Sequence, residues 1–225
     1  MLRESDRRVI RELNREQRRL ASNGPWFLVG YIALSTAIYA VADIWFYDTS
    51  SVDFLMAVTG WALGYVLLVG LMQGGDYFSK GRSGGIGTYF VICLVTGIAI
   101  SLALVVLILP GLYLMMRWIP VYARALTNED WIGNNLRWSW AATEPYQMAL
   151  SVGMVGPVLC YGLAWLPFLA PAAFASVSFE LEAVLVNLVL SIGLGWHTVL
   201  GIATLSVVVS GQAEGGSSAR TQEPA

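Results

Sequence analysis

The stretch LPGLYLMMRWIPVYARAL, residues 109–126, decides how the whole chain is threaded. We expect a turn at its start, because Pro110 lacks a backbone donor and Gly111 tolerates tight turns. The apolar segment that follows, 112–126, is short and carries the cation Arg117. At 1.5 Å per residue it spans only about 22 Å, less than the ~30 Å hydrocarbon core of a bilayer. Whether it crosses a membrane determines the side of every later loop.

Apart from Arg117, the Lys and Arg residues occur only in alternate gaps between six apolar stretches. Because positive charge is retained on the cytoplasmic side during insertion, the alternation predicts that both termini are cytoplasmic. This prediction requires 112–126 to be a crossing, since otherwise all later gaps would change sides. The basic residues in the gaps are Arg3, Arg7, Arg8, Arg11, Arg15, Arg18, Arg19, Lys80, Arg82, Arg124, Arg137 and Arg220.

The composition excludes a soluble globule. Of the 225 residues 56% are apolar and only 12% are charged, against roughly 25% charged in soluble domains. We therefore predict an all-α polytopic transmembrane helical bundle with six spans. Twelve Arg against one Lys, with many Ala, Gly and Trp, are typical of a multi-pass protein of a bacterial inner (plasma) membrane. The predicted spans are 26–46, 54–72, 86–109, 112–126, 146–169 and 181–209.

Three segments are predicted outside the spans. Residues 1–25 form a basic amphipathic cytoplasmic leader, which lies on the membrane surface or pairs with another helix. The alternative is a solvated segment that mainly sets the orientation of the protein in the membrane. Residues 131–143 are rich in Trp and alternate apolar with polar side chains, which predicts an interfacial amphipathic helix. The tail, 210–225, is too polar to fold and is expected to be disordered.

The first span is interpreted as an uncleaved anchor. Ala40-Val41-Ala42 resembles a signal-peptidase site, which leaves cleavage as an alternative. However, the apolar run has about 21 residues, longer than the 7–15 of a secretory core.

The expected partner of the basic face is anionic lipid in the bilayer, with a protein partner or a homo-oligomer as alternatives. Nucleic acid is not expected, because the leader interleaves its Arg residues with acids and contains no aromatic residue. Those acids are Glu4, Asp6, Glu12 and Glu16.

No pattern for catalysis, a cofactor or a metal stands out. Cys93 and Cys160 lie inside apolar runs, where a thiol behaves as a small hydrophobe. The Gly-rich segment 73–87 lacks the spacing of a phosphate-binding loop. We therefore predict a non-enzymatic protein, and an intramembrane enzyme is the weakest alternative.

Three ionisable residues inside the predicted spans are candidate functional or structural sites. Arg117 needs a partner, because an unpaired charge in the membrane costs ~3 kcal/mol. Asp43 is expected at a similar depth, so an ion pair between them is the leading interpretation. Snorkelling of Arg117 to the head groups and a lipid-phosphate or substrate site are the alternatives.

His197 is predicted near the middle of the sixth span, where a histidine is by default a candidate for proton transfer or metal binding. No second His, Cys or carboxylate recurs around it at ligand spacing. A hydrogen-bonded packing role with Asn187, Ser191 or a hydroxyl of another helix is therefore the leading interpretation.

A Pro-Gly-Leu-Tyr turn at 110–113 is followed by Arg117-Trp118, by Glu129 and by a run that opens with Leu136-Arg137 and contains Ser139-Trp140. With this pattern, residues 109–148 resemble the membrane domain associated with glycerophosphoryl diester phosphodiesterases and related bacterial integral membrane proteins. The resemblance departs at Asn135, where Ala is expected, and at Trp138, where a basic residue is expected. It covers only a membrane part, since the phosphodiesterase chemistry belongs to a soluble barrel that this chain has no room for. The residues that carry it are Pro110, Gly111, Tyr113, Arg117, Trp118, Glu129, Leu136, Arg137, Ser139, Trp140 and Thr143.

The function predicted from the sequence is a lipid-interacting or assembly component of the membrane. The alternative is a small-molecule transporter or permease with Arg117 and His197 in its pathway.

Overall fold

The computed structural model describes residues 3–46, 49–78, 85–128 and 130–220. No strand occurs within these ranges, and the prediction of an all-α fold is confirmed. The elements are α1 (Glu4–Asn23), α2 (Pro25–Trp45), α3 (Ser50–Gly74), α4 (Ile86–Val106), α5 (Ile108–Trp118), α6 (Val121–Thr127), α7 (Ile132–Thr143), the 3-10 helix η1 (Glu144–Tyr146), α8 (Gln147–Ala164), α9 (Leu166–Leu169), α10 (Pro171–Phe174) and α11 (Phe179–Arg220).

Five helical stretches of the described chain are long and apolar enough to cross a membrane. This finding fits the predicted membrane protein. Four of the six predicted spans each overlap one such stretch. The span predicted at 146–169 overlaps a longer stretch, which also covers most of the predicted interfacial helix. The span predicted at 112–126 has no counterpart. The five stretches are Pro25–Trp45, Ser51–Gly74, Ile86–Val106, Ile132–Ala164 and Phe179–Gln212.

The predicted helix over 112–126 is wrong as a single element, because the chain breaks there into α5 and α6. Pro120 stands between the two helices and has no N–H for a continuous ladder. With eleven residues, α5 is about 16 Å long, too short to cross a hydrocarbon core alone.

The reversal before α5 also lies elsewhere than predicted. Leu107 has extended dihedral angles and separates α4 from α5. Pro110 sits in the first turn of α5, where a helix tolerates proline. Gly111 does not form the turn: it lies against the side chain of Leu104, where a Cβ would collide. Gly111 therefore serves the close approach of α4 and α5.

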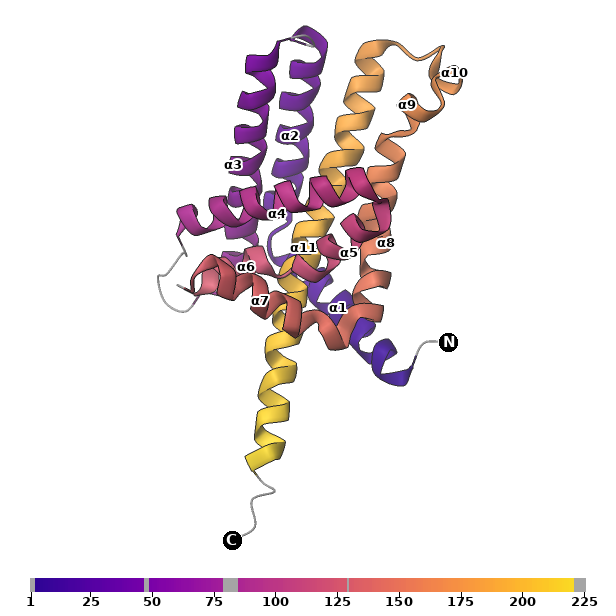
Figure 1. Ribbon diagram of the computed structural model, residues 1–225. Coiled ribbons are helices and arrows are strands. Elements are labelled where there is room, and N and C mark those ends of the chain that lie inside the picture. Colours follow the sequence, from indigo (N-terminus) through magenta and orange to yellow (C-terminus); the bar gives the residue numbers. More distant parts are fainter. Residues whose placement is uncertain (1–2, 47–48, 79–84, 129, 221–225) are drawn as a thin grey trace.

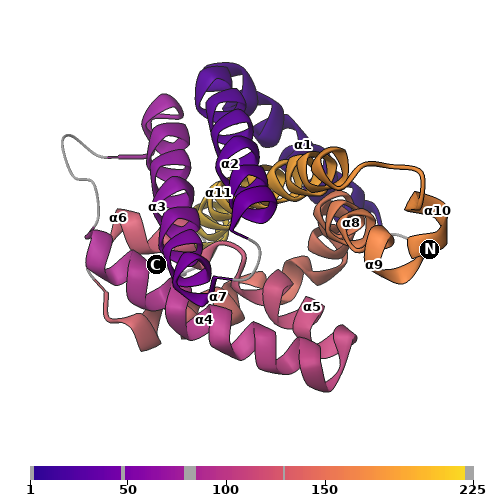
Figure 2. The same cartoon turned by 90° about the horizontal axis from the view of Figure 1, so that it is seen from above.

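Two helical hairpins, α2–α3 and α8–α11, stand beside one another, and α4 lies across them partway down (Figure 1). Seen from above, α4 and α5 run side by side as a pair (Figure 2). The shorter helices α6 and α7, together with α1, lie toward the lower end in Figure 1, where the C-terminal part of α11 also extends. The two ends of the described chain thus lie toward the same end of the molecule.

The packed core lies where α1, α3, α6 and α8 meet the middle of α11. Leu200, Ile202 and Ala203 of α11 are fully buried there. Gly201 lets the carbonyl oxygen of Ile119 approach so closely that a Cβ would lie 2.7 Å from it. The upper hairpins instead leave large apolar side chains exposed, as expected for a surface that faces lipid. Examples on the hairpins are Trp45, Phe54, Val66 and Leu159, and Val105 of α4 and Leu109 of α5 are exposed in the same way.

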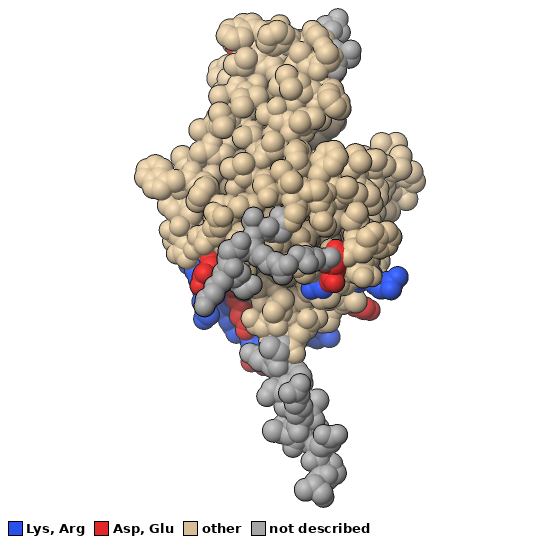
Figure 3. Space-filling view, turned by 90° about the vertical axis from the view of Figure 1, so that its left-hand side faces the viewer, with Lys and Arg blue, Asp and Glu red and all other residues tan. Residues whose placement is uncertain are grey.

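Basic side chains gather at one end of the molecule. Figure 3 shows a broad body with few charges above a band of basic and acidic side chains. The charges outside this band are acidic, and Asp53, Glu180 and Glu182 lie in the first turns of α3 and α11. From residue 20 to residue 116, no described position is Lys or Arg, so α2, α3 and α4 carry no positive charge. This segregation gives the fold an apolar part and a charged end.

Helix α1 belongs to the charged end and is held against the core. Leu13 and Leu20 are buried, while the Arg side chains of the opposite face are exposed. Arg19 pairs with Glu16 at 2.7 Å, and the hydroxyl of Tyr77 donates to the same carboxylate. Burial raises the pKa of Tyr77, and its hydrogen bond to Glu16 acts in the same direction. The phenol therefore keeps its proton and holds α1 to the chain after α3.

The tail differs from the prediction of disorder from residue 210. Helix α11 continues through Arg220, because each further residue adds one backbone hydrogen bond to an existing helix. The last predicted disordered residues, 221–225, lie outside the described residues.

Candidate functional site

Arg117 lies at the end of α5 and is only 1% exposed. One of its terminal nitrogens, Nη2, donates to the carbonyl oxygen of Trp140 on α7. The guanidinium carbon lies 4.6 Å from the ring centroid of Trp140 and 5.8 Å from that of Tyr113. Within the described chain Arg117 makes no ion pair, and its Nε and Nη1 have no hydrogen-bond partner. Aromatic faces and one carbonyl therefore hold the cation.

The predicted ion pair between Arg117 and Asp43 is wrong. Asp43 accepts a hydrogen bond of 2.6 Å from Nδ2 of Asn187, which joins α2 to α11. The prediction assumed that 112–126 crosses the membrane and places Arg117 near the depth of Asp43. Because the chain breaks at Pro120, Arg117 instead faces α7.

The backbone of Arg117 is also fixed by α7. The carbonyl oxygen of Arg117 lies in the last turn of α5, where a helix lacks further N–H groups of its own. Ser139 and Thr143 donate their hydroxyls to this oxygen at 2.8 and 3.3 Å. These bonds join the helix break to one face of α7.

The residues of the sequence motif separate into two groups. Arg117, Tyr113, Trp140, Ser139 and Thr143 meet between α5 and α7. Pro110 and Arg137 are exposed and take no part in this cluster, and Glu129 lies outside the described residues. The clustered residues therefore form a structural joint around a buried cation.

A second Arg–Trp pair joins α6 to α7 and was not predicted from the sequence. The guanidinium of Arg124 lies 4.1 Å from the ring centroid of Trp138 and donates to Asp130 at 2.8 Å. The side chain of Arg124 is 22% exposed, so it stands nearer to the surface than Arg117. Trp138 and Trp140 of α7 thus each contact one arginine of the preceding helices.

His197 lines a cavity of about 1080 Å³. The predicted hydrogen bonds to Asn187 and Ser191 are wrong, because these residues bond elsewhere. Asn187 bonds Asp43 and the carbonyl of Ala183, and Ser191 bonds Ser35 of α2 at 2.8 Å. Nδ1 of His197 is buried and has no partner in the described chain.

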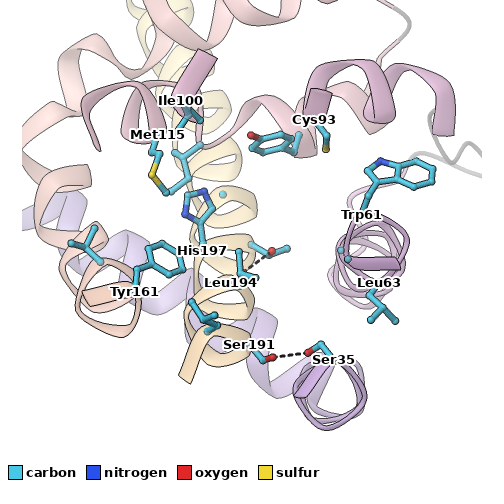
Figure 4. A pocket seen from close by; sticks show the side chains of 18 of the residues that line it. Ser35, Trp61, Leu63, Cys93, Ile100, Met115, Tyr161, Ser191, Leu194 and His197 are labelled. Atoms are coloured by element: carbon cyan, nitrogen blue, oxygen red, sulfur yellow. Dashed lines mark hydrogen bonds between the residues drawn. The ribbon is translucent and has the colours of Figure 1, made fainter. Parts of the chain in front are cut away.

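The cavity lies between the two hairpins, with α4, α5 and α6 also contributing to its wall. Figure 4 shows the imidazole of His197 among the lining side chains, with Tyr161 on one side and Trp61 across the cavity. Most of the wall is apolar. The polar or aromatic lining residues are Tyr31, Ser35, Tyr39, Trp61, Tyr89, Cys93, Tyr122, Tyr161, Trp165, Asn187, Ser191, His197 and Thr198.

Arg117 and Asp43 do not line this cavity, so the three candidate residues do not converge. Sequence reasoning missed Trp61 and Tyr161, which were assigned no role. A signal for the cavity was present in Gly60 and Gly64 on α3, which face it without side chains. In the described chain no group of three His, Cys, Asp or Glu residues could hold a metal.

Comparison with known proteins gives no relative from which a role could be transferred. No family model, curated protein or solved structure matches the chain significantly. The resemblance to the membrane domain of glycerophosphoryl diester phosphodiesterases therefore stays a prediction.

Proposed function

We propose that this protein is a non-enzymatic, multi-pass protein of a bacterial inner membrane that holds anionic lipid at its cytoplasmic face. The observation that carries this proposal is the concentration of basic side chains at one end of a body that carries few charges elsewhere, all of them acidic (Figure 3). A body with exposed apolar side chains is suited to hydrocarbon, and a basic end is suited to anionic head groups.

The exposed face of α1 supplies the lipid contact. Arg7, Arg11, Arg15 and Arg18 follow helical spacing and lie on one side of α1, opposite the buried Leu13. Within the described chain none of these four arginines makes an ion pair. A basic residue near an anionic membrane surface contributes about 1 kcal/mol to membrane binding.

The threading follows from placing the charged end in the cytoplasm. The hairpins α2–α3 and α8–α11 then cross the membrane, while α4 and α5 enter and return to the cytoplasmic side. In this threading neither α4 nor the segment 112–126 crosses the membrane. Two of the six predicted crossings are therefore lost, and because two is an even number, all later loops stay on the sides that the charge alternation predicts. Both termini are then cytoplasmic, and α7 lies at the cytoplasmic interface. The six-span arrangement stays a prediction. Its fourth span would have to consist of α5 and α6, and each of these helices is too short to cross the membrane.

The experiment reconstitutes the full chain in nanodiscs of phosphatidylcholine with a minority of spin-labelled phosphatidylglycerol. We expect enrichment of the labelled lipid around the protein, and loss of most of that enrichment at 1 M salt because surface charges are then screened. Combined replacement of the four arginines by Gln should abolish it, whereas replacement by Lys should preserve it. Enrichment that survives both salt and the Gln variant would overturn the proposal.

The cavity favours a second candidate function, a small-molecule transporter with His197 in its pathway. Arg117 has no place in that pathway, because it does not line the cavity. Transport requires the cavity to open to both sides. A Cys placed at Ser191, in a chain without Cys93 and Cys160, should then react with impermeant thiol reagents from either side. Reaction from one side alone would exclude this candidate. Self-association remains an open prediction for either function.

A further inference from the structure

Three side chains that line the cavity carry a buried polar atom without a partner in the described chain. They are Nε1 of Trp61, the hydroxyl of Tyr161 and Nδ1 of His197. Each unsatisfied buried group costs roughly 1–3 kcal/mol, and most such groups in folded proteins find a partner. Trp61 and Tyr161 can donate hydrogen bonds, and a neutral imidazole can donate or accept. A molecule with a hydrogen-bonding group in the cavity would supply the missing partners.

Among the described residues that line the cavity, none is Lys, Arg, Asp or Glu. A charged head group would therefore enter a low-dielectric space without a counter-charge, at a high cost. The rest of the wall is apolar or aromatic, including Leu68, Leu104 and Met115. This chemistry selects against phosphate and carboxylate and favours an uncharged molecule with a large apolar part.

The dimensions of the cavity suit a chain rather than a compact metabolite. Its volume of about 1080 Å³ lies just above the 300–1,000 Å³ typical of small-molecule pockets. Its lining on α11 runs from Asn187 to Gly201, and these fourteen steps correspond to about 21 Å along the helix. That length exceeds half of a ~30 Å hydrocarbon core.

We propose that the cavity binds an uncharged amphipathic molecule, a long alkyl or isoprenoid chain that ends in a hydroxyl or carbonyl group. The head group lies beside His197 and Tyr161, and the chain fills the apolar length between the hairpins. This inference gives the cavity a ligand class that differs from the anionic lipid at α1. It requires neither transport nor binding at the arginine face.

The test uses the full-length protein in phosphatidylcholine nanodiscs and a hexadecanol that carries a photoreactive diazirine on its chain. After irradiation we expect labelled peptides from the cavity wall, including residues 187–201 of α11. Unlabelled hexadecanol should displace the probe. Hexadecane, which lacks the head group, and hexadecyl phosphate, which is charged, should compete about tenfold less well.

Variants locate the head group. Tyr161→Phe and His197→Ala should each weaken probe binding about threefold to tenfold, the effect of losing one hydrogen bond. Tyr65→Phe is the matched control, because Tyr65 does not line the cavity, and it should leave binding unchanged. If the three competitors act equally, or if Tyr161→Phe behaves like the control, bulk lipid tails fill the cavity and the inference fails. The Gln variant of α1 should label normally, which separates this outcome from failure of the anionic-lipid proposal.

Discussion

At the scale of single residues, Arg117 shows how a buried cation can be held without an acid. Its guanidinium lies beside the rings of both Tyr113 and Trp140, which also contact each other, and it donates to one carbonyl. Cation–π contacts of this kind contribute about 0.5–2 kcal/mol, more when the pair is shielded from water. The sequence identified Arg117 as a residue in need of a partner but could not identify the partner, because that depends on where the helix breaks.

A double-mutant cycle separates the aromatic partner from the acidic one. We expect Arg117→Gln and Trp140→Leu to be coupled by about 0.5–2 kcal/mol in the free energy of unfolding, because the two side chains touch. Arg117→Gln and Asp43→Asn should be additive within about 0.5 kcal/mol, since Asp43 bonds Asn187 instead. Reversible denaturation in detergent measures both cycles. Strong coupling to Asp43 would restore the ion pair predicted from the sequence.

At the scale of elements, the long apolar helices could be predicted and the broken one could not. The predicted span 26–46 nearly coincides with α2, because an uninterrupted apolar run has one structural solution in a membrane. In 112–126 the same rule gave one helix, but the chain forms α5 and α6 around Pro120. The hydroxyls of Ser139 and Thr143 stabilise this break. They belong to another helix, so the sequence around Pro120 carries no signal of them.

The close contact between the broken segment and α11 can be tested at Gly201. A Cβ at this position would lie 2.7 Å from the carbonyl oxygen of Ile119, and a backbone atom cannot rotate away. We expect Gly201→Ala to destabilise the protein by about 1–3 kcal/mol. The matched control is Gly97→Ala in α4, where a Cβ meets nothing within 4 Å; it should be neutral or stabilise the helix by up to about 1 kcal/mol. Thermal unfolding in detergent measures both, and equal effects would contradict the packing described for Gly201.

At the scale of the whole molecule, α1 and the C-terminal part of α11 extend toward the same end (Figure 1). The alternate basic gaps of the sequence predict that both termini are cytoplasmic, and this sidedness stays a prediction. The cavity could not be predicted, because it arises from the space between hairpins whose residues are far apart in the chain. Ser35 and Ser191, which join those hairpins, are 156 residues apart.

The central claim is that α4 and α5 form a hairpin that enters the membrane and returns, rather than two spans joined at the outer surface. Cysteines introduced one at a time into a chain without Cys93 and Cys160 can be labelled on intact cells with a membrane-impermeant maleimide. We expect Ser178→Cys, between α10 and α11, to label, because that connection faces outward in the proposed threading. Leu107→Cys, in the α4–α5 turn, should stay unlabelled until the membrane is dissolved. Equal labelling of both positions on intact cells would contradict the account.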